Sequence, residues 1–142
     1  MSLLLLGLNH NSADLSIRER VAFTPEKLPQ AMRELQGLCI GSEVSILSTC
    51  NRTELLVAFE AEPAPVDEVI KNWLAEFHRL DVGELEPSLY VYRDEAAVRH
   101  LMHVASGLDS LVLGEPQILG QLKSAFALAQ ESGTVGGALN RL

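Results

Sequence analysis

The sequence predicts an α+β domain in which a ferredoxin-like split βαβ antiparallel sheet carries helices on one face and is followed by two C-terminal helices. The main observation is the order of the predicted elements, which is β-α-β-β-α-β before the final pair of helices. The second is that short apolar runs, typical of strands, alternate with segments whose apolar residues recur at helical spacing. The third is that Pro and Gly lie near the predicted helix ends.

Individual elements follow from local patterns. The predicted strands cover residues 3–8, 43–49, 54–60 and 87–92. The predicted helices cover residues 16–23 (a short turn), 24–36, 67–80, 93–106 and 116–132. Thr24 is the expected N-cap of the second helix, Pro25 suits its first position, and Gly37 is the expected stop. Because residues 50–53 separate two strands, Cys50 is predicted to lie on a strand-to-strand turn.

Composition limits the function. Of 142 residues, 47% are hydrophobic and 21% charged, which is typical of one globular domain over residues 1–142. The net charge of −8 argues against a general nucleic-acid binder, because phosphate contacts require clustered Lys and Arg. No segment approaches the roughly 18–20 apolar residues that span a bilayer, so no membrane contact is expected. Two cysteines, Cys39 and Cys50, and no recognisable signal peptide indicate a cytoplasmic protein with reduced thiols.

Cys50 is the first candidate for chemistry. It lies on a polar turn with Arg52 two residues later, and a neighbouring guanidinium favours the nucleophilic thiolate. The alternative is that Cys50 merely fills space at a strand end, as most free cysteines do. Cys39, flanked by apolar residues, is expected to be a filler.

Two further groups stand out. His100 and His103 are three residues apart on a predicted helix, but the cysteines lack metal-ligand spacing, so no metal is expected. His100 lies off the centre of the predicted core stripe of Val98, Leu101, Met102 and Ala105, so surface and cleft positions both remain open. At the start of the last predicted helix, Gln117 and Gln121 lie on one side, and the N-terminus of a helix favours anions. The alternative is that this side is a solvated polar face. No glycine pattern fits a dinucleotide site.

Three stretches together resemble the glutamyl-tRNA reductase family. They are residues 7–13 (GLNHNSA) with 18–23 (RERVAF), residues 48–54 (STCNRTE), and residues 105–123 (ASGLDSLVLGEPQILGQLK). The second and third stretches are long and specific, and the resemblance covers nearly the whole chain, weakening after about Gly133.

The resemblance implies an NADPH-dependent oxidoreductase of the five-carbon route to tetrapyrroles, including porphyrin and haem. Cys50 would attack the ester of glutamyl-tRNA to form a thioester, which NADPH would reduce to glutamate-1-semialdehyde. His100 would assist by proton transfer or by orienting the ester. Arg52 would bind a glutamate carboxylate. The other residues that the resemblance assigns to substrate binding are Thr49, Asn51, Ser110, Glu115, Pro116, Gln117 and Gln121.

The family is longer than this chain. The resemblance implies that 1–142 is the N-terminal catalytic (glutamate-recognition) domain and that the NADPH-binding and dimerisation domains are absent from it. A homodimer is therefore expected for the full-length protein, with glutamate-1-semialdehyde aminomutase as a candidate partner. The acidic balance conflicts with a tRNA ligand unless most tRNA contacts lie elsewhere or a local basic patch exists. The rival hypotheses are a non-enzymatic ferredoxin-like ligand-binding or regulatory module and a thiol redox sensor.

Overall fold

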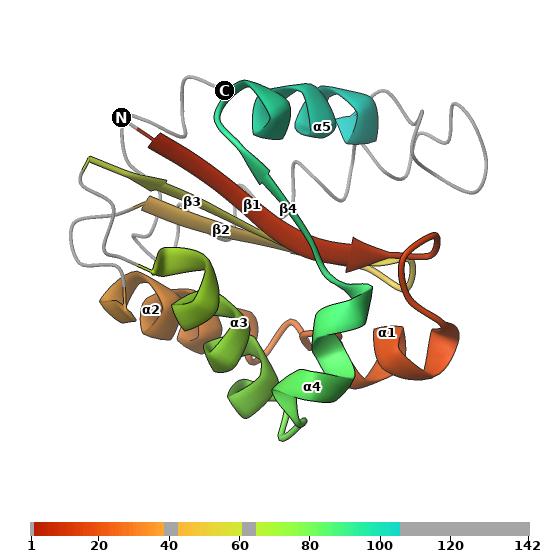
Figure 1. Cartoon of the computed structure of the whole chain (residues 1–142). Coiled ribbons are helices and arrows are strands. Elements are labelled where there is room, and N and C mark those ends of the chain that lie inside the picture. Colours follow the sequence, from red (N-terminus) through yellow and green to blue (C-terminus); the bar gives the residue numbers. More distant parts are fainter. Residues whose placement is uncertain (1, 39–42, 61–64, 106–142) are drawn as a thin grey trace.

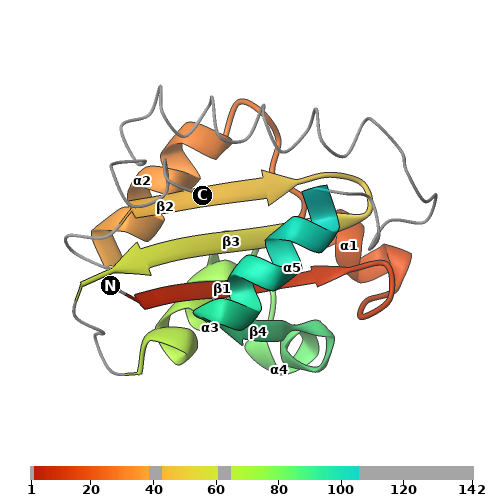
Figure 2. The same cartoon turned by 90° about the horizontal axis from the view of Figure 1, so that it is seen from above.

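A computed structural model describes residues 2–38, 43–60 and 65–105 of the chain. Their elements are β1 (Ser2–Asn9), α1 (Leu15–Val21), α2 (Leu28–Leu38), β2 (Glu43–Ser48), β3 (Arg52–Phe59), α3 (Val66–Phe77), α4 (Val82–Leu85), the 3₁₀ turn η1 (Glu86–Ser88), β4 (Tyr90–Arg93) and α5 (Glu95–Ala105). The four strands form one antiparallel sheet in the order β2-β3-β1-β4 (Figure 2). This order confirms the predicted ferredoxin-like sheet.

Helices pack against both faces of the sheet, which explains why the interior strand β1 carries apolar side chains on both of its sides. Side chains alternate between the two faces along β1. Leu4, Leu6 and Leu8 pack in the larger core with residues of α2 and α3, whereas Leu3 and Leu5 pack with α5. Figure 1 shows α2, α3 and α4 below the sheet and α5 above it. The expected pair of helices thus shares one face, while the first C-terminal helix covers the other.

Local signals place most helices within a few residues of their predicted limits. Asp14 caps α1, because its side chain accepts a hydrogen bond from the Ile17 N–H at 3.0 Å. The segment at Thr24 is a turn, in which the Thr24 carbonyl accepts bonds from the Lys27 and Leu28 N–H groups at 3.0 and 3.1 Å. Helix α2 therefore begins at Leu28, three residues after Pro25, the predicted first position.

Several predictions were wrong in detail. Gly37 lies inside α2 instead of ending it, and the segment after α3 forms the unpredicted short helix α4. The predicted strand 87–92 is a 3₁₀ turn followed by β4. Met102 is 66% exposed, so it is not part of the α5 core stripe, in which Ala97 and Val104 are buried. The predicted helix 116–132 lies outside the described residues.

No helix in the described ranges combines the length and apolarity required to cross a membrane.

Gly7 lies where β1 approaches β3 most closely. A Cβ atom at Gly7 would meet the Thr53 carbonyl oxygen at 2.5 Å and Glu54 Cγ at 2.9 Å. We expect Gly7→Ala to lower the free energy of unfolding by about 1–3 kcal/mol, because strand backbone cannot shift as a flexible side chain can. Urea denaturation measures this loss. Gly37→Ala is the matched control, since a Cβ there meets nothing within 4 Å and helix propensity favours Ala; equal losses in both variants would contradict the steric argument.

An aromatic cluster fills the angle between α3 and the segment before α2. The Phe23 ring lies 5.2 Å from Phe77 and 4.5 Å from His78, and Trp73 lies 5.3 Å from Phe77, measured between ring centroids. Burial, together with the positive charge of Lys27, lowers the pKa of His78 from 6.5 to about 4. The imidazole is therefore neutral in the folded protein at neutral pH.

The lowered pKa predicts a loss of stability in acid. Below pH 6.5 the unfolded chain binds a proton at His78, whereas the folded chain does not bind it until about pH 4. The free energy of unfolding therefore falls as the pH drops from 6.5 to 4, by about 1–2 kcal/mol because solvent screens part of the effect. Urea denaturation across this range should show a smaller fall for His78→Gln than for wild type or His103→Gln. Equal pH dependence of stability in the wild type and both variants would contradict the assignment of this acid sensitivity to His78.

Candidate active site

Cys50 is exposed, in the turn that joins β2 to β3. The Thr49 hydroxyl shapes this turn by accepting hydrogen bonds from the Asn51 and Arg52 N–H groups at 3.1 and 3.2 Å. The Thr49 N–H in turn donates to the Arg52 carbonyl at 2.8 Å. Hydrogen bonds with Thr49 therefore stabilise the turn, and Cys50 is exposed on it. The sequence predicted this turn between two strands.

The guanidinium at the Cys50 turn belongs to Arg18. Its Nη1 donates to the Cys50 carbonyl at 3.2 Å and to Asn51 Oδ1 at 3.5 Å. The sequence predicted that Arg52 would have this place beside the thiol. Arg52 instead is the first residue of β3, and its side chain is completely buried. Strand alternation explains the difference, because it places Arg52 on the face of the sheet that α5 covers.

Glu54 is the centre of a buried polar cluster above the sheet. It lies two residues after Arg52 on β3 and is 3% exposed. Its Oε1 pairs with Arg52 Nη1 at 3.4 Å, and its Oε2 accepts a hydrogen bond from the Tyr90 hydroxyl at 2.7 Å. The His100 Nε2 atom contacts the same Oε2. One carboxylate thus links side chains from β3, β4 and α5.

Glycine at position 7 leaves the space that the Glu54 side chain occupies at its Cγ atom. Gly7 is paired with Glu54 across the β1–β3 ladder, and a Cβ at Gly7 would lie 2.9 Å from Glu54 Cγ. Sequence reasoning missed Glu54, which it treated only as the start of a strand. The available signal was the i, i+2 spacing of Arg52 and Glu54, which places opposite charges on one face of a strand.

His100 faces the sheet and a neighbouring pocket. Its ring stacks against Tyr92, with centroids 4.7 Å apart, and lies 5.3 Å from the Tyr90 ring. The pocket has a volume of about 350 Å³, and its lining is Asn9, Asn11, Ser12, Tyr90, Tyr92, His100 and His103. Of the two positions left open for His100, the structure shows the cleft.

The loop after β1 forms one wall of this pocket. Asn9 is 5% exposed, and its Oδ1 accepts hydrogen bonds from the Asn11 and Ser12 N–H groups at 2.9 and 3.2 Å. The Asn9 N–H donates to Ser12 Oγ at 2.9 Å. These bonds satisfy the loop backbone locally, so the loop keeps a fixed shape beside His100.

Only part of the predicted substrate site can be placed. Thr49, Cys50 and Asn51 lie in the turn, and Arg52 and His100 meet at Glu54. Ser110, Glu115, Pro116, Gln117 and Gln121 lie outside the described residues, as does Cys39. Within the described ranges, no group of three or more His, Cys, Asp and Glu side chains has a metal-binding arrangement.

Residues 6–142 match the family model of the glutamyl-tRNA(Glu) reductase N-terminal domain. The chain belongs to this family. It is 58% identical over all 142 residues to glutamyl-tRNA reductases of Pseudomonas fluorescens strain SBW25 and of Marinobacter nauticus, and it covers 32% of each. The solved glutamyl-tRNA reductase of Methanopyrus kandleri superposes with a TM-score of 0.75 at 30% identity, over 96% of this chain and 30% of that one. The chain thus spans about a third of the length of the curated relatives it matches.

Proposed function

We propose that this chain forms the thioester intermediate of a glutamyl-tRNA reductase. The Cys50 thiolate attacks the ester carbonyl of glutamyl-tRNA, and a carbon–sulfur bond forms as the carbon–oxygen bond to the ribose breaks. The tRNA leaves with a free hydroxyl after its oxygen takes up a proton. The observation that carries the proposal is the exposed Cys50 at the tip of a hairpin whose next strand starts at Arg52 and carries Glu54 two residues later. An aminoacyl ester is already activated, so a thiolate suffices as nucleophile.

Arg52 and His100 have separate roles in this proposal. Arg52 binds the glutamate carboxylate through its planar guanidinium, which the substrate must reach beside Glu54 because the side chain is buried. His100 orients the ester or supplies the proton to the departing ribose oxygen. Glu54 is a positioning residue, since it contacts both side chains. Thr49 and Asn51 hold the turn, and Ser110, Glu115, Pro116, Gln117 and Gln121 complete the glutamate pocket.

The reductive half of the reaction is assigned to parts of the protein other than the described residues. Hydride from NADPH would reduce the thioester to glutamate-1-semialdehyde and release the Cys50 thiolate. The described strands are antiparallel, and none leads through a glycine-rich turn into a helix, so these residues do not fit a dinucleotide. We therefore assign the NADPH-binding and dimerisation domains to the remaining length of the relatives. We further propose that the full-length protein is cytoplasmic and forms a homodimer. The aminomutase that consumes the aldehyde is a candidate partner.

Trapping the intermediate tests the proposal. The protein is mixed with glutamyl-tRNA carrying labelled glutamate in the absence of NADPH, quenched in acid, digested and analysed by mass spectrometry. We expect one glutamyl group on the peptide that contains Cys50, released by hydroxylamine as thioesters are. The absence of label on this peptide, with label retained on the tRNA, would refute the thioester step. Selective alkylation of Cys50 over Cys39 at neutral pH separates this enzyme from a module whose cysteine is incidental.

A further inference from the structure

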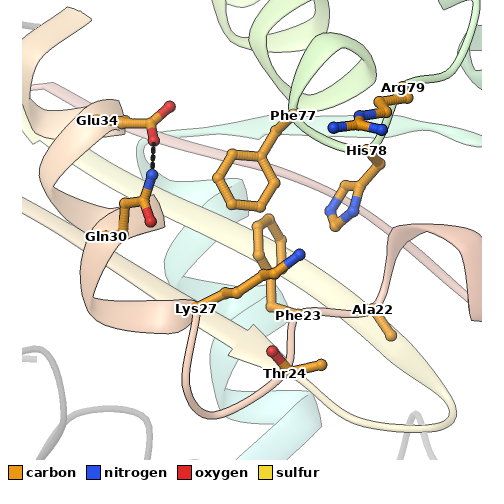
Figure 3. Close-up of a pocket in the computed structure, with 9 residues that line it drawn as sticks. All are labelled: Ala22, Phe23, Thr24, Lys27, Gln30, Glu34, Phe77, His78 and Arg79. Carbon is orange, nitrogen blue, oxygen red and sulfur yellow. Dashed lines mark hydrogen bonds between the residues drawn. The ribbon is translucent and has the colours of Figure 1, made fainter.

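A second pocket opens on the face of the sheet opposite to Glu54. It has a volume of about 610 Å³ and lies between α2, the end of α3 and the segment before α2. Figure 3 shows Phe23 and Phe77 in its middle, with Lys27, His78 and Arg79 toward one end and Gln30 with Glu34 at the other. Neither the glutamate site nor the thioester step uses these residues.

One end of the pocket favours an anion. Lys27 and Arg79 are exposed cations, and the positive charge of Lys27 is close enough to act on His78. The His78 Nε2 atom is buried and has no hydrogen-bond partner among the described residues. A buried polar atom without a hydrogen-bond partner lowers the stability of the fold, and a ligand that bonds to it would remove this cost. A phosphate oxygen placed here would meet two positive charges, and a phosphate or ribose hydroxyl could bond to the imidazole.

The other end offers acceptors beside aromatic surface. Glu34 Oε2 accepts from Gln30 Nε2 at 2.9 Å, and Glu34 Oε1 accepts from Trp73 Nε1 at 3.3 Å. Each carboxylate oxygen can accept a further hydrogen bond, for example from an exocyclic amine. Between the two ends, the Phe77 ring gives a flat apolar surface of the kind on which bases stack.

The pocket also borders the reactive hairpin. The Phe23 N–H donates to Ser48 Oγ at 2.9 Å, so the wall of the pocket is bonded to the end of β2. Ser48 precedes Cys50 by two residues, which span at most about 7 Å of backbone. The pocket wall at Phe23 is therefore joined, through the end of β2, to the turn that carries Cys50.

We propose that this pocket binds the 3′-terminal adenosine and its phosphate at the end of an RNA substrate. The phosphate lies between Lys27 and Arg79, the base stacks on Phe77, and the adenine amine donates to Glu34. The inference rests on the proposed function for its choice of substrate. It also resolves the conflict between an acidic chain and an RNA ligand, because the cations are local.

Calorimetric titration of the purified protein tests the pocket without requiring catalysis. The probes are AMP, adenosine, inorganic phosphate, 2′,5′-ADP, and RNA hairpins ending in CCA or lacking the final A. We expect AMP to bind more tightly than adenosine or phosphate, and the CCA hairpin to bind more tightly than AMP. Lys27→Gln and Arg79→Gln should each weaken AMP and CCA-hairpin binding about tenfold. Arg33→Gln, which removes one exposed charge from α2 outside the pocket, should leave both unchanged.

Each other outcome overturns the inference. If AMP does not bind, or if Lys27→Gln, Arg79→Gln and Arg33→Gln all bind it with the same affinity, the pocket is not a nucleotide site. If both hairpins bind with equal affinity, the pocket does not recognise the terminal adenosine. If 2′,5′-ADP or free AMP binds more tightly than the CCA hairpin, the ligand of the pocket is a free nucleotide. Thioester trapping is measured separately. Trapping without AMP binding refutes only the pocket, and AMP binding without trapping refutes only the thioester step.

Discussion

Cys50→Ser should abolish thioester formation from glutamyl-tRNA, lowering the rate by a factor on the order of 10³ or more. A serine hydroxyl stays protonated at neutral pH, and in the part of the chain that the structure describes no base is hydrogen-bonded to the side chain at position 50. Because Cys50 is exposed, the substitution should change the free energy of unfolding by no more than about 0.5 kcal/mol. The loss would therefore be chemical and not structural. Single-turnover trapping of labelled glutamate measures the rate, and urea denaturation measures the stability.

Cys39→Ser is the matched control for Cys50→Ser, since it removes the other thiol of the chain. We expect it to retain the labelled adduct on the peptide that contains Cys50. Persistence of the adduct in Cys50→Ser, or its loss in Cys39→Ser alone, would remove Cys50 from the mechanism.

Glu54→Ala should cost about 3–5 kcal/mol of unfolding free energy, which is the usual effect of breaking a buried ion pair. The Arg52 side chain is fully buried, and the substitution takes away the carboxylate with which it pairs. The Tyr90 hydroxyl and His100 lose the same acceptor. Glu54→Gln keeps the shape and an acceptor oxygen, so it should cost less. Urea denaturation measures all of these differences.

An exposed ion pair provides the control for Glu54. Glu84 pairs with Arg20 at 3.1 Å, and both side chains are about half exposed. Glu84→Ala should therefore change stability by no more than about 1 kcal/mol. If Glu54→Ala costs no more than Glu84→Ala, the buried cluster does not hold this end of the sheet together.

A positioning role for Glu54 also predicts a kinetic effect that stability alone would not produce. In Glu54→Gln, measured where the protein is fully folded, thioester formation should slow because Arg52 and His100 lose their shared charged partner. Alkylation of Cys50 by a small reagent should keep its rate, because the turn is held by Thr49 and Arg18. Equal slowing of both reactions would indicate a general distortion of the hairpin instead.

The sequence was a good guide wherever a local pattern decided the structure. The apolar run at residues 3–8 became the interior strand β1, whose side chains pack into both cores of the sheet. The location of Cys50 followed from its place between two strand patterns. The start of α2 was misplaced because Thr24 and Pro25 also suit a turn, and no sequence rule distinguishes that turn from a first helical turn.

What the sequence determined by itself was the order of the strands and the main helices, the strand-to-strand turn that carries Cys50, and the motifs that resemble the family. Only the tertiary structure decided which charges meet. It placed Arg18, 32 residues before Cys50, at the reactive turn, and it joined Arg52, Tyr90 and His100 through Glu54. The physical reason is that strand periodicity fixes which face a side chain occupies, whereas the partner it meets there depends on how the distant strands and α5 pack.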